Sequence, residues 1–199
     1  MARPDEAPRV HFESAEEWRA WLLEHAESES AAWLVSWRSG TGRPAVPYED
    51  AVLHALSVGW VDSTQRRIDD ERTMLYFARR KPDSMWSRSN KERVERLDRE
   101  GLMTAAGERA VAEAKSRGTW NGLDDIEDLV VPDDLAAAFA AVPGSREHWD
   151  GFTRSQRRAV LVWIVQAKRP ETRARRVEET ARLAAEGKRA NEQPPELRR

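Results

Sequence analysis

Polar and aromatic side chains that could bind a ligand are concentrated in two short segments of the sequence. The first segment, residues 59–63, carries Trp60, Asp62 and Ser63 and leads into a pair of arginines. The second spans residues 79–90, and its candidate side chains are Arg79, Ser84, Trp86, Ser87 and Asn90. Arginine donates in a fork geometry that suits carboxylates and phosphates, and indole rings form flat apolar walls. Together the segments predict a Trp/Arg pocket that binds a small polar or anionic ligand.

Each of these residues also has a structural interpretation. Asp62 could cap an element or pair with an arginine, and Trp86 could belong to the core. Ser87, Ser89 or Asn90 could be the N-cap of a following helix, because short polar side chains accept hydrogen bonds from first-turn amides. The sequence leaves both interpretations open.

Cations near the C-terminus could complete such a pocket. Arg173 and Arg176 are three residues apart, so a helix would carry them on one stripe, and Lys168 lies just before a break at Pro170. One interpretation is that they pair with acidic residues of segment 108–150. The other is that they reach the cluster of Trp60, Asp62 and Trp86.

The elements that must position these residues are a hairpin and several helices. Residues 59–68 and 73–80 are predicted strands on either side of a polar turn, and residues 31–37 are a third strand. Ser14 and Glu17 form a capping-box pattern at the start of a helix, and a second helix is expected over 48–57. Residues 1–11 are Pro-rich and expected to be frayed.

After residue 80 only helices are expected. Their predicted ranges are 90–100, 107–117, 132–142, 155–169 (apolar on every side at its centre) and 171–187. The fold class is therefore α+β: a small antiparallel sheet of about three strands packed with helices, followed by an all-helical C-terminal half. We expect an N-terminal lobe at 12–105, a helical lobe at 106–187 packed on it as one compact unit, and a disordered tail at 188–199.

Composition excludes several classes of protein. The 199 residues include 33 basic and 35 acidic side chains, nine tryptophans and no cysteine. Without cysteine there are no disulfides and no thiolate chemistry. The near-neutral charge makes nucleic-acid binding unlikely as a main role. No secretory signal or membrane span is evident, so a cytoplasmic location is expected.

The sequence offers no recognisable catalytic or cofactor motif. Its four histidines are isolated, so no metal site is expected. There is no P-loop and no dinucleotide-binding glycine motif, and we expect no cofactor. Ser63, Ser84 and Ser87 have no histidine nearby in sequence that would indicate a catalytic triad. Catalytic residues are therefore unassigned.

Four strings together resemble the YdeI/OmpD-associated, or bacteriocin-protection, family. They are A-L-x-x-G-W-V-D-S at 55–63, the residues Arg79, Arg80, Ser84, Trp86, Ser87 and Asn90, G-L-M-T-A-A-G at 101–107, and A-K at 167–168 followed by E-T-R-A-R-R at 171–176. The likeness extends over most of residues 14–187 and adds Thr172 to the candidate site. It implies a soluble bacterial protein linked to tolerance of antimicrobial peptides. It implies no reaction and no catalytic residue.

Three kinds of function remain. The first is a binding or stress-tolerance module with the ligand pocket described above. The second is an enzyme in which Asp62 is the acid or base and arginines stabilise anionic charge. The third is an adaptor that binds nucleic acid through the basic C-terminal helix, or binds a protein partner.

Overall fold

The chain divides into two units. The structure is a computed structural model that describes residues 4–192, and the units are Met1–Gly122 and Leu123–Arg199. The sequence placed the division between 105 and 106. The observed division is later because helix α4 (Ala105–Ser116) packs against α2 (Tyr48–Ser57) in the first unit.

The N-terminal unit contains a four-stranded mixed sheet. Strands β2 (Ala31–Trp37), β3 (Trp60–Arg67) and β4 (Arg72–Arg79) are antiparallel, and the order is β1-β2-β4-β3. The predicted hairpin of β3 and β4 is confirmed. The short strand β1 (Arg9–His11) pairs parallel to β2, so the expectation of a frayed segment is wrong there. Three residues are too few for a strand pattern, and β1 forms because the edge of β2 offers it hydrogen-bond partners.

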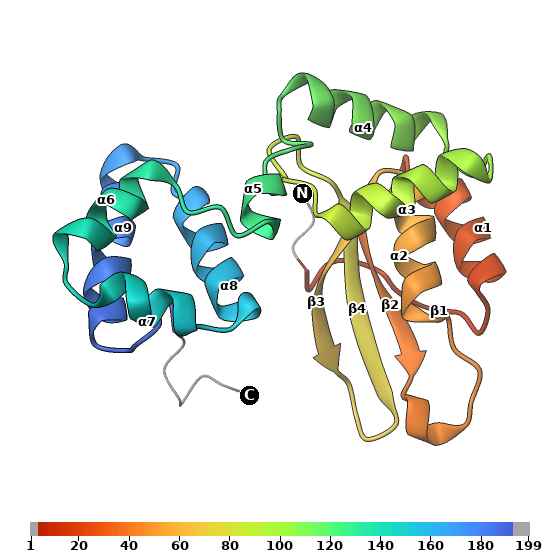
Figure 1. Ribbon diagram of the computed structural model, residues 1–199. Helices are drawn as coiled ribbons and strands as arrows, with labels where there is room; N and C mark the ends of the chain where they lie inside the picture. Colours follow the sequence, from red (N-terminus) through yellow and green to blue (C-terminus); the bar gives the residue numbers. More distant parts are fainter. Residues whose placement is uncertain (1–3, 193–199) are drawn as a thin grey trace. The chain divides into compact units, whose positions relative to one another are not determined.

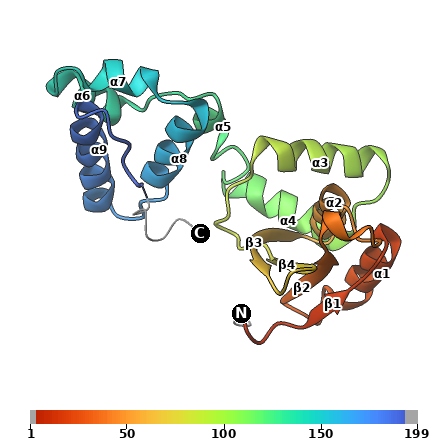
Figure 2. The same cartoon turned by 90° about the horizontal axis from the view of Figure 1, so that it is seen from below.

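Four helices cover one face of this sheet, as Figures 1 and 2 show. They are α1 (Ala15–His25), α2, α3 (Arg88–Arg99) and α4. The capping box of Ser14 and Glu17 at the start of α1 is confirmed. Apolar side chains of all four helices pack with Ala32, Leu34 and Phe77 of the sheet in one core cluster.

Side chains on the covered face form rows across three strands. The register gives the rows Ser36–Thr73–Arg67, Leu34–Leu75–Gln65 and Ala32–Phe77–Asp62. Asp62 and Gln65 are three residues apart in β3, but a β-bulge lies between them. The side chain of Gln65 therefore lies on the same face of the sheet as that of Asp62. The turn of the β3–β4 hairpin lies near the N-terminal end of α2 (Figure 1).

The opposite face of the sheet carries no helix of the N-terminal unit. Trp33, Met74 and Tyr76 form a small cluster there, and Ala7 of the N-terminal segment packs against it. The Trp33 indole donates to the carbonyl of Pro4 at 2.7 Å, and the Trp33 amide donates to the carbonyl of Pro8. The N-terminal segment is thus held across the sheet.

The described part of the C-terminal unit is helical. Its helices are α5 (Asp124–Glu127), α6 (Asp133–Ala141), α7 (Ser145–Gly151), α8 (Arg154–Val165) and α9 (Pro170–Ala185). The last helix contacts α6, α7 and α8. Residues 188–192 are described and Ala190 is buried, which differs from the expected disordered tail; residues 193–199 lie outside the described residues.

Helix α8 differs from its prediction in two ways. Its N-cap is Thr153, whose side chain accepts from the Gln156 amide, instead of Ser155. It is not buried on every side: Val160, Leu161 and Ile164 are buried, but Val165 is 38% exposed. Helix α8 contacts α5 and α9.

The α+β fold class is confirmed, with one strand more than expected. Among residues 4–192, no helix is long and apolar enough to cross a membrane.

Candidate functional site

A pocket of about 620 Å³ lies over the first two rows of the sheet, beside the first turn of α2. We call it the sheet pocket. Its apolar lining consists of Leu34, Trp37, Val46, Ala51 and Leu75, and its polar lining includes Ser36, Arg38, Tyr48, Gln65, Arg67 and Thr73. Small-molecule sites have this size and this mixture of apolar walls with a few polar groups.

Polarity in the sheet pocket changes with depth. Leu34, Val46 and Ala51 are buried in the core. Arg38 and Gln65 are exposed, and Ser36 is half-buried. The Gln65 amide donates to the Thr73 hydroxyl, which itself donates to the carbonyl of Arg66. The floor is therefore apolar, and free donors of Ser36, Arg38 and Gln65 lie nearer the mouth.

Tyr48 and Asp62 form a hydrogen-bonded pair at the edge of the sheet pocket. The Tyr48 hydroxyl donates to Asp62 Oδ2 at 3.0 Å. Burial first, and the Asp62 carboxylate second, raise the pKa of Tyr48 above its usual value of 10.0. The hydrogen bond from the phenol fixes the orientation of the Asp62 carboxylate.

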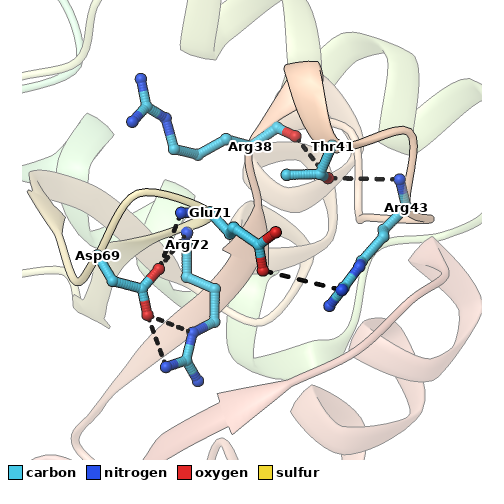
Figure 3. A network of polar contacts seen from close by, with 6 residues as sticks. All are labelled: Arg38, Thr41, Arg43, Asp69, Glu71 and Arg72. Atoms are coloured by element: carbon cyan, nitrogen blue, oxygen red, sulfur yellow. Dashed lines mark hydrogen bonds and ion pairs between the residues drawn. The ribbon is translucent and has the colours of Figure 1, made fainter.

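Most arginines around the sheet pocket are neutralised by carboxylates. Arg66 pairs with Asp5 at 3.4 Å, Arg43 with Glu71 at 3.8 Å, and Arg72 with Asp69 at 2.6 Å; Arg67 pairs with Asp70. Arg38 differs, because within residues 4–192 the only hydrogen-bond partner of its guanidinium is the carbonyl of Asp70, at 3.3 Å. Figure 3 shows its side chain extending away from Asp69 and Glu71.

A polar clasp joins loop 38–47 to the hairpin turn at 69–72 (Figure 3). The Arg38 amide donates to the carbonyl of Glu71 at 2.8 Å, and Arg43 reaches the Glu71 carboxylate. Arg43 also stacks over the Trp37 ring, 4.2 Å from its centroid. The turn is braced by Asp69, whose pKa is lowered chiefly by its hydrogen bond from Arg72. The clasp holds the wall of the sheet pocket that carries Arg38.

The two tryptophans of the predicted site are buried. Trp60 has no exposed surface and packs in the main core cluster, and Trp86 is 2% exposed. Trp86 lies against Trp120 and beneath the guanidinium of Arg80, whose Cζ is 3.8 Å from the ring centroid. Neither indole lines the sheet pocket.

The two adjacent arginines at the end of β4 have different environments. Arg79 Nη2 donates to the carbonyls of Ala26, Glu27 and Glu29, where α1 ends. Burial lowers the pKa of Arg80 to about 10. Its Nε and Nη1 atoms are buried and have no partner among the described residues, while Nη2 donates to Met85. Arg79 therefore secures a helix end, and Arg80 is a buried cation stacked on Trp86.

The short polar residues of the second segment have local partners. Ser87 is the N-cap of α3 and accepts from the Asn90 amide, which confirms the capping interpretation. The Asn90 side chain accepts from Arg93, and Ser84 accepts from Arg80 at 3.5 Å. Ser63 is exposed at the bulge of β3. Of the candidate site residues in segments 59–63 and 79–90, only Asp62 lies at the sheet pocket, where it accepts a hydrogen bond from Tyr48.

The predicted cations of the C-terminal unit also have partners within that unit. Arg173 makes two hydrogen bonds to Asp134, at 2.7 and 3.0 Å, and thereby lowers the pKa of Asp134. The charge-pairing interpretation is confirmed for Arg173. Arg176 stacks on Trp163 and donates to its carbonyl. Thr172 is half-buried and Lys168 is exposed. That Lys168, Arg173 and Arg176 reach the cluster of Trp60, Asp62 and Trp86 stays a prediction.

Sequence reasoning missed the residues that line the sheet pocket. Tyr48 and Gln65 looked like ordinary positions of a helix and a strand, and Arg38 looked like the start of a loop. The only sequence signal was an apolar strand ending in Trp37-Arg38 before a Gly- and Pro-containing loop. Among the described residues, no group of three or more His, Asp or Glu side chains could hold a metal ion.

Comparison with known proteins matches two family models to the chain. Residues 10–110, slightly more than half of the chain, match a domain of unknown function (DUF8412). Residues 128–187 match the model described as bacteriocin-protection, YdeI or OmpD-associated, which contains the string at 167–176 but not those at 55–63, 79–90 and 101–107. No curated protein and no solved structure is significantly similar. The chain therefore belongs to the DUF8412 family, and residues 128–187 of its C-terminal unit are similar to the YdeI/OmpD-associated, bacteriocin-protection model.

Proposed function

We propose that the N-terminal unit binds a small anionic ligand in the sheet pocket. The observation that carries this proposal is the guanidinium of Arg38, which lines the pocket and has no carboxylate partner within residues 4–192. A charge-assisted hydrogen bond to an anion would supply the partner that the neighbouring arginines already have. The proposed site differs from the Trp/Arg pocket expected from the sequence, which was centred on Trp60, Trp86 and Arg79.

Neutral donors near Arg38 support the same ligand chemistry. The Ser36 hydroxyl and the second amide N–H of Gln65 have no acceptor among the described residues, and both residues line the sheet pocket. The first turn of α2 also borders the pocket, and its N-cap, Pro47, supplies no side-chain acceptor. A helix N-terminus favours negative charge, and Glu49 and Asp50 already stand in this first turn. Ser36 and Gln65 therefore supply the neutral donors beside Arg38.

Binding is better supported than acid–base catalysis at Asp62. One Asp62 oxygen already accepts the Tyr48 proton donor at 3.0 Å, and the raised pKa of Tyr48 keeps that donor in place. In our proposal Asp62 orients Tyr48 at the edge of the pocket and takes no part in a reaction.

Fluorescence titration tests the proposal. Trp37 precedes Arg38 at the border of the pocket and its ring is stacked under Arg43, so an occupant that reorders this wall should change its emission, and the Trp37→Phe variant should lose that change. We would titrate a panel of small carboxylates, phosphates and sulfonates at constant ionic strength. Arg38→Gln should raise the Kd of a binding anion about 10-fold or more, because hydrogen bonds to charged groups contribute about 1.5–3 kcal/mol.

The matched control is Arg99→Gln, which removes an exposed arginine of α3 that does not line the pocket. It should leave Kd unchanged. If no anion of the panel binds, or if both variants weaken binding equally through net charge alone, the proposal is wrong.

The family match of the C-terminal unit suggests a physiological setting. We propose that the chain contributes to protection against bacteriocins, on the ground of the description of the model matched by residues 128–187. A strain lacking the protein should be more sensitive to a bacteriocin panel, and expression of the full chain should restore tolerance. Unchanged sensitivity across the panel would contradict this role.

A further inference from the structure

We infer that the sheet pocket takes a monocarboxylate with a compact apolar body, its carboxylate at Arg38 and its body on the leucine floor. This inference rests on the proposed function and narrows it to one class of ligand. Three features carry it: the charge balance around the pocket, the depth at which apolar residues lie, and the spacing of the sheet rows.

The charge balance favours a single negative charge. Arg43, Arg66 and Arg67 each have a carboxylate partner, so they contribute little net positive charge to an occupant. Only Arg38 retains an uncompensated charge among the pocket-lining residues described. A ligand with two negative charges would find no second unpaired cation in the described pocket lining.

The floor requires an apolar body. Leu34 is 2% exposed, Ala51 2% and Val46 6%, and Leu75 joins Leu34 in the second row of the sheet. No charged side chain of the pocket lining lies in that row, where the third member is the amide of Gln65. Leu75 is half-buried, so an inorganic anion would leave its remaining surface in water, whereas an apolar body would cover it.

The sheet rows set the length of the body. The first row, with Ser36 and Thr73, is two residues from the second row, with Leu34 and Leu75. Two residues of a strand span about 6.6–6.8 Å. A carboxylate near Ser36 and Arg38 therefore places the far end of a five- or six-carbon body, or of one ring, over the leucines.

Calorimetry with four probes tests the class of ligand. Hexanoate has one charge and an apolar body, hexanamide lacks the charge, adipate adds a second charge, and inorganic phosphate lacks the body. Hexanoate should bind at least 10-fold more tightly than each of the others, with a negative heat-capacity change from apolar burial. The Arg38→Gln variant should bind hexanoate only as weakly as hexanamide. The Arg99→Gln variant should keep the affinity for hexanoate unchanged.

A floor variant separates the two parts of the inference. Leu75→Thr should weaken hexanoate binding several-fold and leave phosphate unaffected, with circular dichroism confirming that the variant is folded. Tighter binding of adipate or phosphate that depends on Arg38 would overturn the ligand class and keep the proposed function. Equal binding of hexanoate and hexanamide would overturn the carboxylate contact. Binding of none of the probes would overturn the ligand class, and the wider anion panel would then decide the proposed function.

Discussion

The junction of α2 and α4 depends on Gly107, and replacing this residue should destabilise the N-terminal unit. Gly107 is buried in the first turn of α4, against the end of α2. A Cβ atom added there would lie 2.3 Å from the carbonyl oxygen of Ser57 and 2.9 Å from Met103 Cε. The same carbonyl accepts hydrogen bonds from the Thr104 hydroxyl at 2.7 Å and the Thr104 amide at 3.1 Å. The added methyl therefore meets backbone that is already held in place.

The expected magnitude follows from that contact. Real Cβ contacts stay beyond 3.0 Å, so in Gly107→Ala helix α4 must move by about 0.7 Å or more. Overpacking of this kind costs about 1–3 kcal/mol. Alanine also lowers the conformational entropy of the unfolded chain, which stabilises the folded state by about 0.4–1 kcal/mol and offsets part of this cost. With the middle of each range, a cost of about 2 kcal/mol and an offset of about 0.7 kcal/mol, we expect a net loss of about 1.3 kcal/mol.

Urea unfolding measures this loss. With a slope of about 2 kcal/mol/M, the midpoint of the N-terminal unit should fall by about 0.5–1 M. Gly40→Ala is the control, because a Cβ at Gly40 meets nothing within 4 Å. It should leave the midpoint unchanged or raise it slightly. A midpoint for Gly107→Ala as high as that of Gly40→Ala would refute the close contact of α2 and α4.

Three further predictions concern titration and the clasp. Burial first, and the charge of Arg19 second, lower the pKa of His54, so the stability of the fold should decrease as the pH drops below about 6.5. The His54→Gln variant should lose less stability between pH 7.5 and pH 5.5, as measured by urea midpoints. Arg173→Ala should raise the pKa of Asp134 toward about 3.9 in a carboxyl NMR titration, and an unchanged pKa would contradict their pairing. Arg43→Ala should change the free energy of unfolding by about 1 kcal/mol or less, because the ion pair of Arg43 is exposed. The same variant should nevertheless speed hydrogen exchange of the backbone amides in residues 39–46. Equal exchange in both proteins would show that the clasp does not hold the loop.

The sequence predicted local elements well because their signals are local. The capping box at Ser14, the strand at 31–37 and the hairpin after residue 59 each have a pattern within a few residues, and all three are confirmed. Strand β1 has no such pattern. It exists because its backbone finds the edge of β2 more than twenty residues away, which no local periodicity reveals.

The candidate site was harder to predict because its residues come together only in the tertiary fold. Alternation correctly placed Trp60 and Asp62 on one face of β3, but α1 and α2 cover that face at Trp60, so the indole lies in the core. The two arginines at 79 and 80 could not be distinguished, because their environments depend on where β4 ends. The sheet pocket joins residue 38 to residue 65 across three strands, and that pairing order is not evident in the sequence.

The most direct test of the account is an NMR map of where an anion binds. Hexanoate would be titrated into isotopically labelled protein, with backbone amides and arginine Nε–H groups observed. The account predicts saturable shift changes at Ser36, Arg38 and Gln65, with the Arg38 Nε–H among the most affected, and their loss in Arg38→Gln. Shift changes centred on Arg80 and Trp86, or none in the sheet pocket at saturating anion, would contradict the account.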